Sequence, residues 1–253
     1  MTREYERTHP WLTFSLELDR ASPEFWMLLG EVRSKCDHIR GTPLRPDTAE
    51  KLHRVFLAKG VLATTAIEGN TLTLDQVQDH LDGKLRLPPS KAYLQKEVDN
   101  VIKLTNKVFN GLNNISERPV IGTDSLEVYN RFILEGLAWD DGVVPGEIRT
   151  YPVGVGRYRG APAADCRYLL DRLCEWLNSD CFQQPEHGIA LDVIKAVVAH
   201  LYFAWIHPFG DGNGRSARML EFHILAEAGV PMPACQLLSN HYNETRTEYY
   251  RQL

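Results

Sequence analysis

Apolar residues recur at intervals of three and four along most of the chain, which is the period of an amphipathic helix. Several of these stretches begin with Ser, Thr, Asp or Pro and end at Gly, which are typical helix boundaries. The pattern predicts helices over 23–39, 46–68, 73–83, 92–109, 123–136, 164–178, 189–206, 215–228 and 242–253.

The segment from 149 to 162 breaks this helical pattern. Residues 153–158 alternate β-branched residues with glycines, which predicts a small β-hairpin or an extended flap. The predicted fold is therefore mainly α, a helical bundle with a small β-hairpin flap. We expect an N-terminal helical region over 1–90 and a core over 91–253, packed as one unit.

Composition and charge exclude several classes of protein. The chain has 253 residues, of which 43% are hydrophobic, so it is neither disordered nor a low-complexity linker. A net charge of −5 argues against a nucleic-acid partner or an anionic membrane surface. We expect no signal peptide and no membrane span. Five irregularly spaced cysteines without a Cys-x-x-Cys predict reduced thiols and a cytoplasmic location.

The most informative segment is the loop HPFGDGNGRSAR at 207–218, between two strongly helical stretches. The flexible backbone of Gly212, Asn213 and Gly214 permits a turn whose N–H groups point inward, as in an anion nest. The helix that follows directs its positive end to the same place. Arg215 and Arg218 are three residues apart, share a face, and carry guanidinium groups that suit phosphate oxygens. This segment predicts a phosphate site.

Two further side chains in this loop add chemistry to the phosphate site. Asp211 offers a hard oxygen ligand, and Mg²⁺ typically binds through one or two carboxylates together with phosphate oxygens. His207 has an ordinary pKa near neutrality and is the natural general base of the loop.

The loop resembles the signature of the Fic (filamentation induced by cAMP) family, H-x-F-x-[DE]-G-N-G-R-x-x-R, at every fixed position. The resemblance implies a protein adenylyltransferase that transfers AMP from ATP to a Ser, Thr or Tyr hydroxyl of a target protein. It also implies that catalysis depends mainly on positioning and charge stabilisation.

The resemblance also implies roles for the matched residues. His207 would deprotonate the hydroxyl, and Asp211 would hold Mg²⁺ against the α- and β-phosphates. The backbone over 212–214, with Asn213, would steady the transferred phosphoryl group. Arg215 would bind the β-phosphate and Arg218 the γ-phosphate.

A second motif, TTAIEGN at 64–70, ends the second predicted helix. Thr64 and Glu68 share a helix face, and a carboxylate at this negative end of a helix is unfavourable without a cation nearby. The segment resembles the inhibitory motif [ST]-x-x-x-E-[GN] of Fic proteins whose inhibitory helix precedes the core. The resemblance implies that Glu68 pairs with Arg218 and blocks the γ-phosphate. We expect Glu68→Gly to raise transfer and self-modification.

Two other resemblances are less specific. The flap residues Val155, Gly156, Arg157 and Tyr158 are similar to the hairpin edge that aligns a target segment in the family, although a plain surface hairpin would show the same pattern. Tyr250, next to Tyr249, is similar to the adenine-side wall, with core packing as the alternative. His200 is interpreted as a packed or hydrogen-bonded histidine.

Other functions stay open at this point. The alternatives are a de-AMPylase, a transferase of another nucleotide moiety, and an ATP-sensing regulatory protein without turnover. A homo-oligomer is compatible with the family. Many relatives continue into a winged-helix module beyond the point at which this sequence ends.

Overall fold

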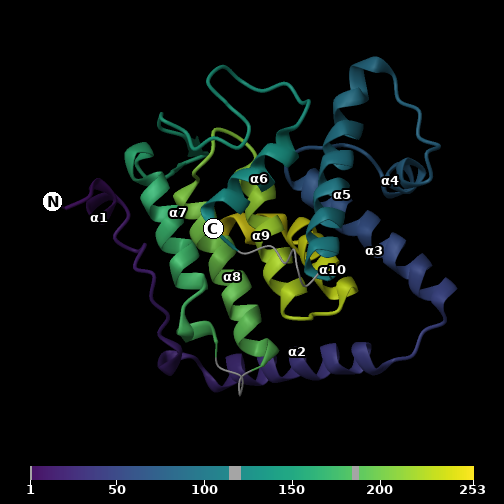
Figure 1. Cartoon of the computed structure of the whole chain (residues 1–253), viewed down its shortest axis with the longest axis horizontal. Coiled ribbons are helices and arrows are strands. Elements are labelled where there is room, and N and C mark those ends of the chain that lie inside the picture. The colour runs from purple at the N-terminus through teal and green to yellow at the C-terminus, as the bar shows by residue number, and fades with distance from the viewer. Residues whose placement is uncertain (1, 114–120, 184–187) are drawn as a thin grey trace.

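The computed structural model describes residues 2–113, 121–183 and 188–253, and most of these residues are helical (Figure 1). The α-helices are α1 (Glu4–Thr8), α2 (Pro23–Gly41), α3 (Pro46–Ile67), α4 (Leu74–Leu81), α5 (Ala92–Asn113), α6 (Thr123–Leu134), α7 (Ala163–Leu177), α8 (Ile189–Ile206), α9 (Asn213–Glu227), α10 (Met232–Glu244) and α11 (Arg246–Gln252). The strands are β1 (Gly154–Val155) and β2 (Tyr158–Arg159), and the 3-10 turns are η1 (Leu18–Arg20), η2 (Pro89–Lys91) and η4 (Asp180–Phe182).

Helix α8 lies at the centre of the bundle, beside α7 and α9, while α2 crosses one end (Figure 1). The length and hydropathy of α8 would suffice for a membrane span, but half of this helix is buried inside the protein. Phe203 and Ile206 are fully enclosed in the main core. The composition of α8 is therefore that of a central core helix.

Helix α3 packs along α10 and also contacts α4 and α5. A second apolar cluster lies under this N-terminal part, with Leu57, Val61, Val77 and Val98 among its buried members. Gly60 lies where α3 meets α10, and a Cβ added there would lie 2.7 Å from the backbone oxygen of Gln236. The close approach of α3 to α10 therefore requires glycine at this position.

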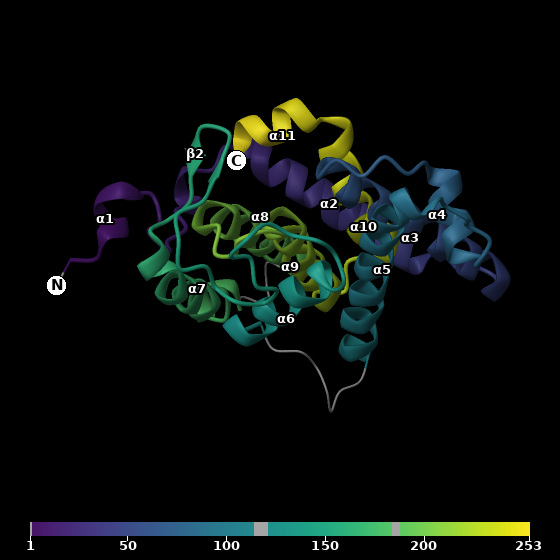
Figure 2. The same ribbon diagram turned by 90° about the horizontal axis from the view of Figure 1, so that it is seen from above.

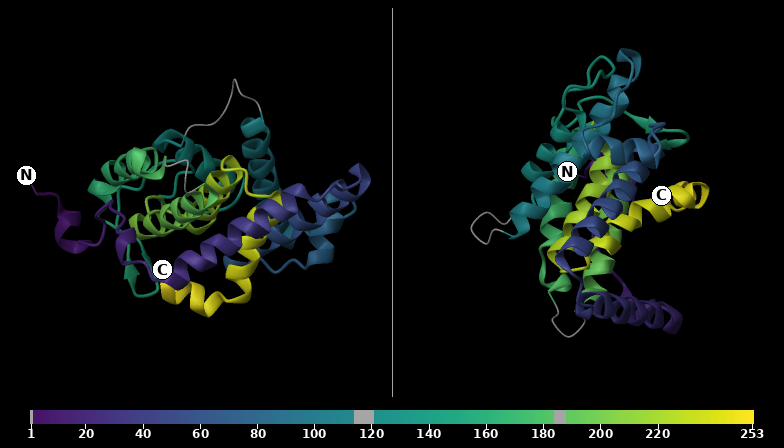
Figure 3. Two further views of the ribbon diagram at one scale, coloured as in Figure 1. Left: turned by 90° about the horizontal axis from the view of Figure 1, so that it is seen from below. Right: turned by 90° about the vertical axis from the view of Figure 1, so that its right-hand side faces the viewer.

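The β-hairpin projects from the bundle on the same side as α11 (Figure 2). Its strands are antiparallel, with Gly154 opposite Arg159 and Val155 opposite Tyr158. Gly156, with φ of 57°, makes the turn between them. The end-on view confirms that the hairpin and the C-terminal helix extend in the same direction (Figure 3, right). The two project above one face of the bundle.

The mainly α fold with one small hairpin is confirmed, and all five cysteines are free thiols as expected. Several elements differ from the sequence prediction. Helices α1 and α10 were not predicted, and α9 begins at Asn213 rather than 215. A single helix over 242–253 is wrong, because the chain turns at Thr245 between α10 and α11.

The contact at Gly60 predicts a loss of stability on substitution. Gly60→Ala places a methyl group against the backbone of α10, and overpacking of this kind costs about 1–3 kcal/mol. Each kcal/mol corresponds to roughly 2–4 °C in the thermal midpoint of a chain of this size. Gly30→Ala, on α2, is the matched control because nothing lies within 4 Å of its added Cβ. Helix propensity predicts a small gain there, about 0.5–1 kcal/mol. Equal midpoints for the two variants would contradict the close approach.

Candidate active site

An open cavity of about 440 Å³ lies between the hairpin, α11, the end of α3 and the junction of α8 with α9. It is lined by Glu68, Val155, Gly156, Tyr158, Ala204, His207, Gly214, Arg218, Tyr249, Tyr250 and Leu253. Most of the predicted site residues therefore meet around one cavity. The predicted residues outside this lining are Arg157, Asp211, Gly212, Asn213 and Arg215.

Arg149 holds the start of the signature loop in place. Helix α8 ends at His207, whose φ of 50° is in the left-handed region that a residue with a side chain rarely adopts. The Arg149 Nε donates to the His207 carbonyl oxygen at 2.8 Å, and the same guanidinium donates to Tyr151 O at 2.7 Å and Ala161 O at 2.6 Å. The backbone N–H of Arg149 donates to Pro208 O at 3.0 Å. These bonds stabilise the left-handed turn at His207.

The His207 imidazole is oriented as a proton acceptor. Its Nδ1 lies 3.2 Å from the carbonyl oxygen of Ala204, so Nδ1 carries the proton and donates it there. Nε2 is then the unprotonated nitrogen. Burial lowers the pKa of His207, and the nearby Arg149 cation lowers it further, against the bond to Ala204 and the carboxylates of Glu68 and Asp211. The imidazole is therefore neutral at neutral pH.

Asn213 closes the loop from inside. Its Oδ1 accepts from Phe209 N at 2.9 Å, and its Nδ2 donates to Phe209 O at 2.9 Å. Gly212 takes a left-handed conformation as the N-cap of α9, so Asn213 and Gly214 lie in the first helical turn rather than in the loop. A Cβ added at Gly214 would lie 2.4 Å from Glu68 Oε1. Glycine at this position lets the carboxylate approach the start of α9.

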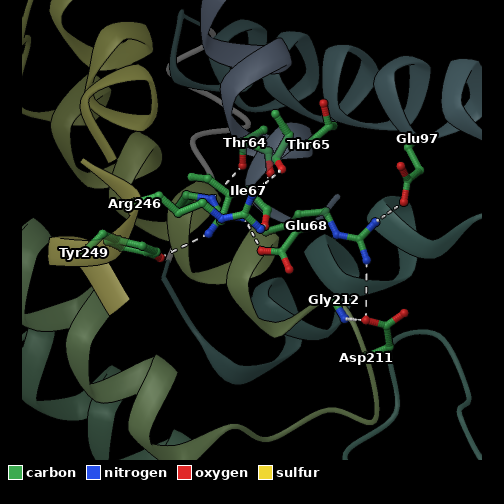
Figure 4. A network of polar contacts seen from close by, with 12 residues as sticks. Thr64, Thr65, Ile67, Glu68, Glu97, Asp211, Gly212, Arg246 and Tyr249 are labelled. Atoms are coloured by element: carbon green, nitrogen blue, oxygen red, sulfur yellow. Dashed lines mark hydrogen bonds and ion pairs between the residues drawn. The ribbon is translucent and has the colours of Figure 1, made fainter. Parts of the chain in front are cut away.

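Arg218 is the most enclosed charge of the site, with only 3% of its surface exposed. Its Nε donates to Thr64 Oγ1 at 2.7 Å, and Nη1 donates to Tyr249 Oη at 3.1 Å. Nη2 donates to Thr64 O at 3.1 Å and forms an ion pair with Glu68 Oε1 at 2.5 Å (Figure 4). Residues from α3, α9 and α11 thus converge on one guanidinium.

The pairing of Glu68 with Arg218 determines the ionisation of both groups. Burial opposes the charge on Glu68, but Arg218, with Arg215 and His207, outweighs it and lowers the pKa of the carboxyl group. Burial likewise opposes the charge on Arg218, and Glu68 with Tyr249 outweighs it and raises the pKa. Both groups are charged at neutral pH.

Arg215 is held by a second carboxylate that the sequence analysis missed. Its Nη1 lies 3.1 Å from Glu97 Oε1 on α5, and its Nη2 lies 3.4 Å from Asp211 Oδ1. Glu97 Oε2 also accepts from Asn70 Nδ2 at 2.8 Å. The buried Nε of Arg215 has no partner among the residues that the structure describes. Arg215 therefore presents an unsatisfied donor beside the start of α9.

Asp211 provides the carboxylate that a magnesium ion would need. Its Oδ1 accepts from Gly212 N at 2.5 Å and faces Arg215, and half of its side chain is exposed. The described residues contain no cluster of three or more His, Cys, Asp or Glu side chains that could hold a metal by themselves. One exposed carboxylate fits an ion that takes its remaining oxygens from phosphate and water.

The two tyrosines of α11 differ in their surroundings. Tyr249 is buried, and its hydroxyl bonds Arg218 and His200 Nε2, the latter at 2.9 Å. His200 Nδ1 lies 3.1 Å from Glu221 Oε2, so His200 is a hydrogen-bonded core histidine as expected. Tyr250 is half-exposed and lines the cavity. Both tyrosines line the cavity, and Tyr250 is the more exposed of the two.

The hairpin contributes another part of the cavity wall through Val155, Gly156 and Tyr158. Val155 and Gly156 are exposed at its tip, and Tyr158 is fixed by a bond from its hydroxyl to Trp205 O at 2.7 Å. Arg157 is exposed and does not line the cavity.

A family model described as "Fic/DOC family" matches residues 123–225, which include the whole signature loop. Residues 123–225 of this chain form a Fic/DOC domain. The fold agrees with a solved Fic family protein from Desulfovibrio desulfuricans G20, with a TM-score of 0.68 and 25% identity over 91% of this chain and 65% of that one. It also agrees in fold with Caenorhabditis elegans Fic-1, with a TM-score of 0.66 and 22% identity over 97% of this chain and 75% of that one.

Curated relatives of this Fic domain chain are named protein adenylyltransferase fic-1. The Caenorhabditis briggsae protein is 34% identical over 197 residues, which are 76% of this chain and 35% of the relative. The Caenorhabditis elegans protein is 32% identical over 225 residues, which are 88% of this chain and 40% of the relative. The chain thus spans about two fifths or less of the length of these relatives.

Some residues of the Fic site carry no signal in the sequence. Arg149 and Glu97 lie far from the signature loop along the chain, and each reaches it only through the tertiary fold. In the sequence, a single Arg or Glu outside a motif cannot be distinguished from a charged residue exposed to solvent. Thr64 had a signal, because it opens the inhibitory motif on the same helix face as Glu68.

The electrostatics predict a low pKa for His207 that NMR can measure. In the folded protein the imidazole stays neutral as the pH falls through the ordinary value of 6.5, and it becomes charged only below that pH. Glu68→Gln removes a carboxylate that favours imidazolium, so the midpoint moves lower still. Histidine ring resonances followed against pH, with the His207 signal assigned by its loss in His207→Ala, measure both values. A midpoint at or above 6.5 in the wild type would contradict this account.

Proposed function

We propose that this chain is a protein adenylyltransferase, which transfers AMP from ATP to a hydroxyl side chain of a target protein, and that Glu68 inhibits it. The observation that supports this most directly is the ion pair between Glu68 and Arg218 within the cavity that His207 lines. The names of the relatives support the same reaction.

His207 is the general base in this proposal. Its Nε2 takes the proton of the target hydroxyl while the hydroxyl oxygen forms a bond to the α-phosphorus of ATP. The bond between the α-phosphorus and the oxygen bridging to the β-phosphate breaks, and pyrophosphate leaves. A neutral imidazole at physiological pH suits this step, and the bonds from Arg149 to the loop keep the ring in place.

The start of α9 binds the phosphates. Its first N–H groups and the positive end of its dipole favour anions, and Arg215 and Arg218 add two cations. Arg215 binds the β-phosphate and Arg218 the γ-phosphate, while the backbone over 212–214 steadies the transferred phosphoryl group. Because the side chain of Asn213 is bonded to Phe209, Asn213 acts by shaping the loop. Magnesium bound through Asp211 would neutralise phosphate charge and orient the leaving group.

Glu68 inhibits by occupying the cation that the γ-phosphate needs. A carboxylate already 2.5 Å from Arg218 must leave before a phosphate oxygen can bind there. ATP bound without that contact is misplaced for in-line attack, because misplacement of about 1 Å can cost 10²-fold in rate. The resting protein is therefore weakly active.

The two walls of the cavity bind the remaining parts of the substrates. Tyr250 packs against the adenine ring, and the exposed hairpin edge at Val155 and Gly156 pairs with the backbone of the target segment.

Removal of AMP from a modified protein is the second candidate. In this candidate function the Glu68 carboxylate orients a water molecule toward a bound AMP–protein ester, and the position of Glu68 in the same cavity as His207 supports it. The same cavity would then serve transfer and hydrolysis, with Glu68 in a different role in each.

The deciding experiment compares self-modification in variants of the whole chain. Glu68→Gly removes the competing carboxylate, so incubation with ATP and Mg²⁺ adds the mass of AMP to the protein. Glu68→Gly combined with His207→Ala loses about 10²–10⁴-fold of that rate, because the general base is gone. Intact-mass spectrometry and ATP labelled at the α or γ position measure the outcome.

The other outcomes reject the proposal in distinguishable ways. Label from the γ-phosphate means phosphorylation, and ATP binding without any label means a nucleotide sensor. Loss of AMP from premodified protein with the wild type, but not with Glu68→Gly, favours the second candidate.

Magnesium dependence tests the role of Asp211. In the Glu68→Gly background, Asp211→Asn keeps the size of the side chain and removes its charge. Loss of an outer-shell partner alone typically weakens metal binding about tenfold, so we expect the half-saturating Mg²⁺ concentration to rise at least ~10-fold. Transfer rates measured against Mg²⁺ give this value. An unchanged Mg²⁺ curve would remove Asp211 from the metal site.

A further inference from the structure

We propose that α11 latches the inhibitory end of α3, with Arg246 and the hydroxyl of Tyr250 as positioning groups that keep Glu68 on Arg218. This inference rests on the proposed function, because it concerns how the inhibition of that site is maintained.

The contacts of the latch lie directly beside Glu68. Arg246 Nη2 donates to the carbonyl oxygen of Ile67, and Nη1 donates to that of Ala66 at 3.4 Å (Figure 4). The hydroxyl of Tyr250 donates to Ile67 O at 3.3 Å. Ile67 is the last residue of α3, and Glu68 is its C-cap. The latch therefore binds the peptide unit that joins Ile67 to Glu68.

The end of α3 requires a cation from elsewhere. The last carbonyl oxygens of a helix have no partners within the helix and form the negative end of its dipole. The last turn of α3 has no basic residue, and Glu68 adds a carboxylate at the same end. Arg246 brings a positive charge to this end from a helix nearly 180 residues later. Without it, the carbonyl oxygens of Ala66 and Ile67 lose a charged donor, and the end of α3 holds Glu68 less firmly on Arg218.

The same helix also holds the other member of the ion pair. Tyr249 accepts from Arg218 Nη1 at 3.1 Å, while Arg246, one turn earlier, holds the end of α3. Helix α11 thus grips both sides of the contact between Glu68 and Arg218. Since Arg246 is exposed at the surface, its contacts are also among the first to be lost if α11 moves.

The test measures nucleotide affinity and self-modification in Arg246→Ala and Tyr250→Phe. Tyr250→Phe removes only the hydroxyl and keeps the ring that faces the cavity. Arg251→Ala is the matched control, because Arg251 is exposed on the same helix and pairs with Glu248. Isothermal titration with ATP and, separately, with ADP isolates the γ-phosphate contact, and titration with AMP reports the base contact.

We expect Arg246→Ala to raise ATP affinity and the self-modification rate by about twofold to fivefold, the scale of a cation at a helix end. We expect Tyr250→Phe to raise ATP affinity and the self-modification rate as well, by a smaller factor than Arg246→Ala. ADP and AMP, which have no γ-phosphate, bind Arg246→Ala and the wild type alike, and Arg251→Ala matches the wild type with every nucleotide. If Arg246→Ala fails to fold, Tyr250→Phe carries the test.

The Glu68→Gly background identifies the route of the effect. If Arg246 acts through Glu68, then Arg246→Ala adds nothing to Glu68→Gly. An effect that persists in that background, a change in the ADP or AMP affinity of Arg246→Ala, or no change in either single variant would overturn the latch. Inactivity of Glu68→Gly itself would instead refute the proposed function, so the two failures are distinguishable.

Discussion

The burial of one positive charge organises this site. Arg218 lies almost wholly inside the protein, where an unpaired ion costs several kcal/mol. Its donors are satisfied by Thr64 and Glu68 from α3 and by Tyr249 from α11. Parts of the chain from near its beginning and from its end are therefore tied together by the need to neutralise a guanidinium that belongs to the signature loop. The interaction that completes the resting fold is also the one that occupies the site.

In the resting protein, carboxylates of the chain itself occupy the arginines at which an anionic ligand would bind. Two arginines at the positive end of α9 create a demand for negative charge, and carboxylates meet it: Glu68 on Arg218, and Glu97 with Asp211 on Arg215. In the proposed function, a triphosphate that enters the site exchanges one anion for another. The free energy that opposes ATP is then the difference between two charge-assisted contacts, which partly cancel. Small changes at the end of α3 are sufficient to shift that balance.

A feature of the fold or the site can be predicted from the sequence when the residues that form it are close together along the chain. Helical spacing predicted most of the bundle, and the segment from His207 to Arg218 singled out residues that line one cavity, because both signals are local. The boundary of α9 was placed two residues late, since Gly214, which suggested a loop, lies in the first helical turn and allows Glu68 to approach it. Arg149 and Glu97 could not be predicted, because their partners are set by packing between distant elements.

Two of the three buried arginines of the site, Arg218 and Arg149, show why the identity of the partner matters more than burial itself. Arg218 is neutralised by a carboxylate, so burial and pairing together leave little net charge in the cavity. Arg149 has carbonyl oxygens as the partners of its guanidinium within the described ranges, and these satisfy its donors without cancelling its charge. Burial is the main cause of the lowered pKa of His207, and the uncancelled charge of Arg149 beside the imidazole lowers that pKa further, so Nε2 stays unprotonated. In the proposed function, the pairing of Arg218 with Glu68 keeps phosphate from Arg218, while Arg149 adds to the effect of burial that keeps the His207 base neutral.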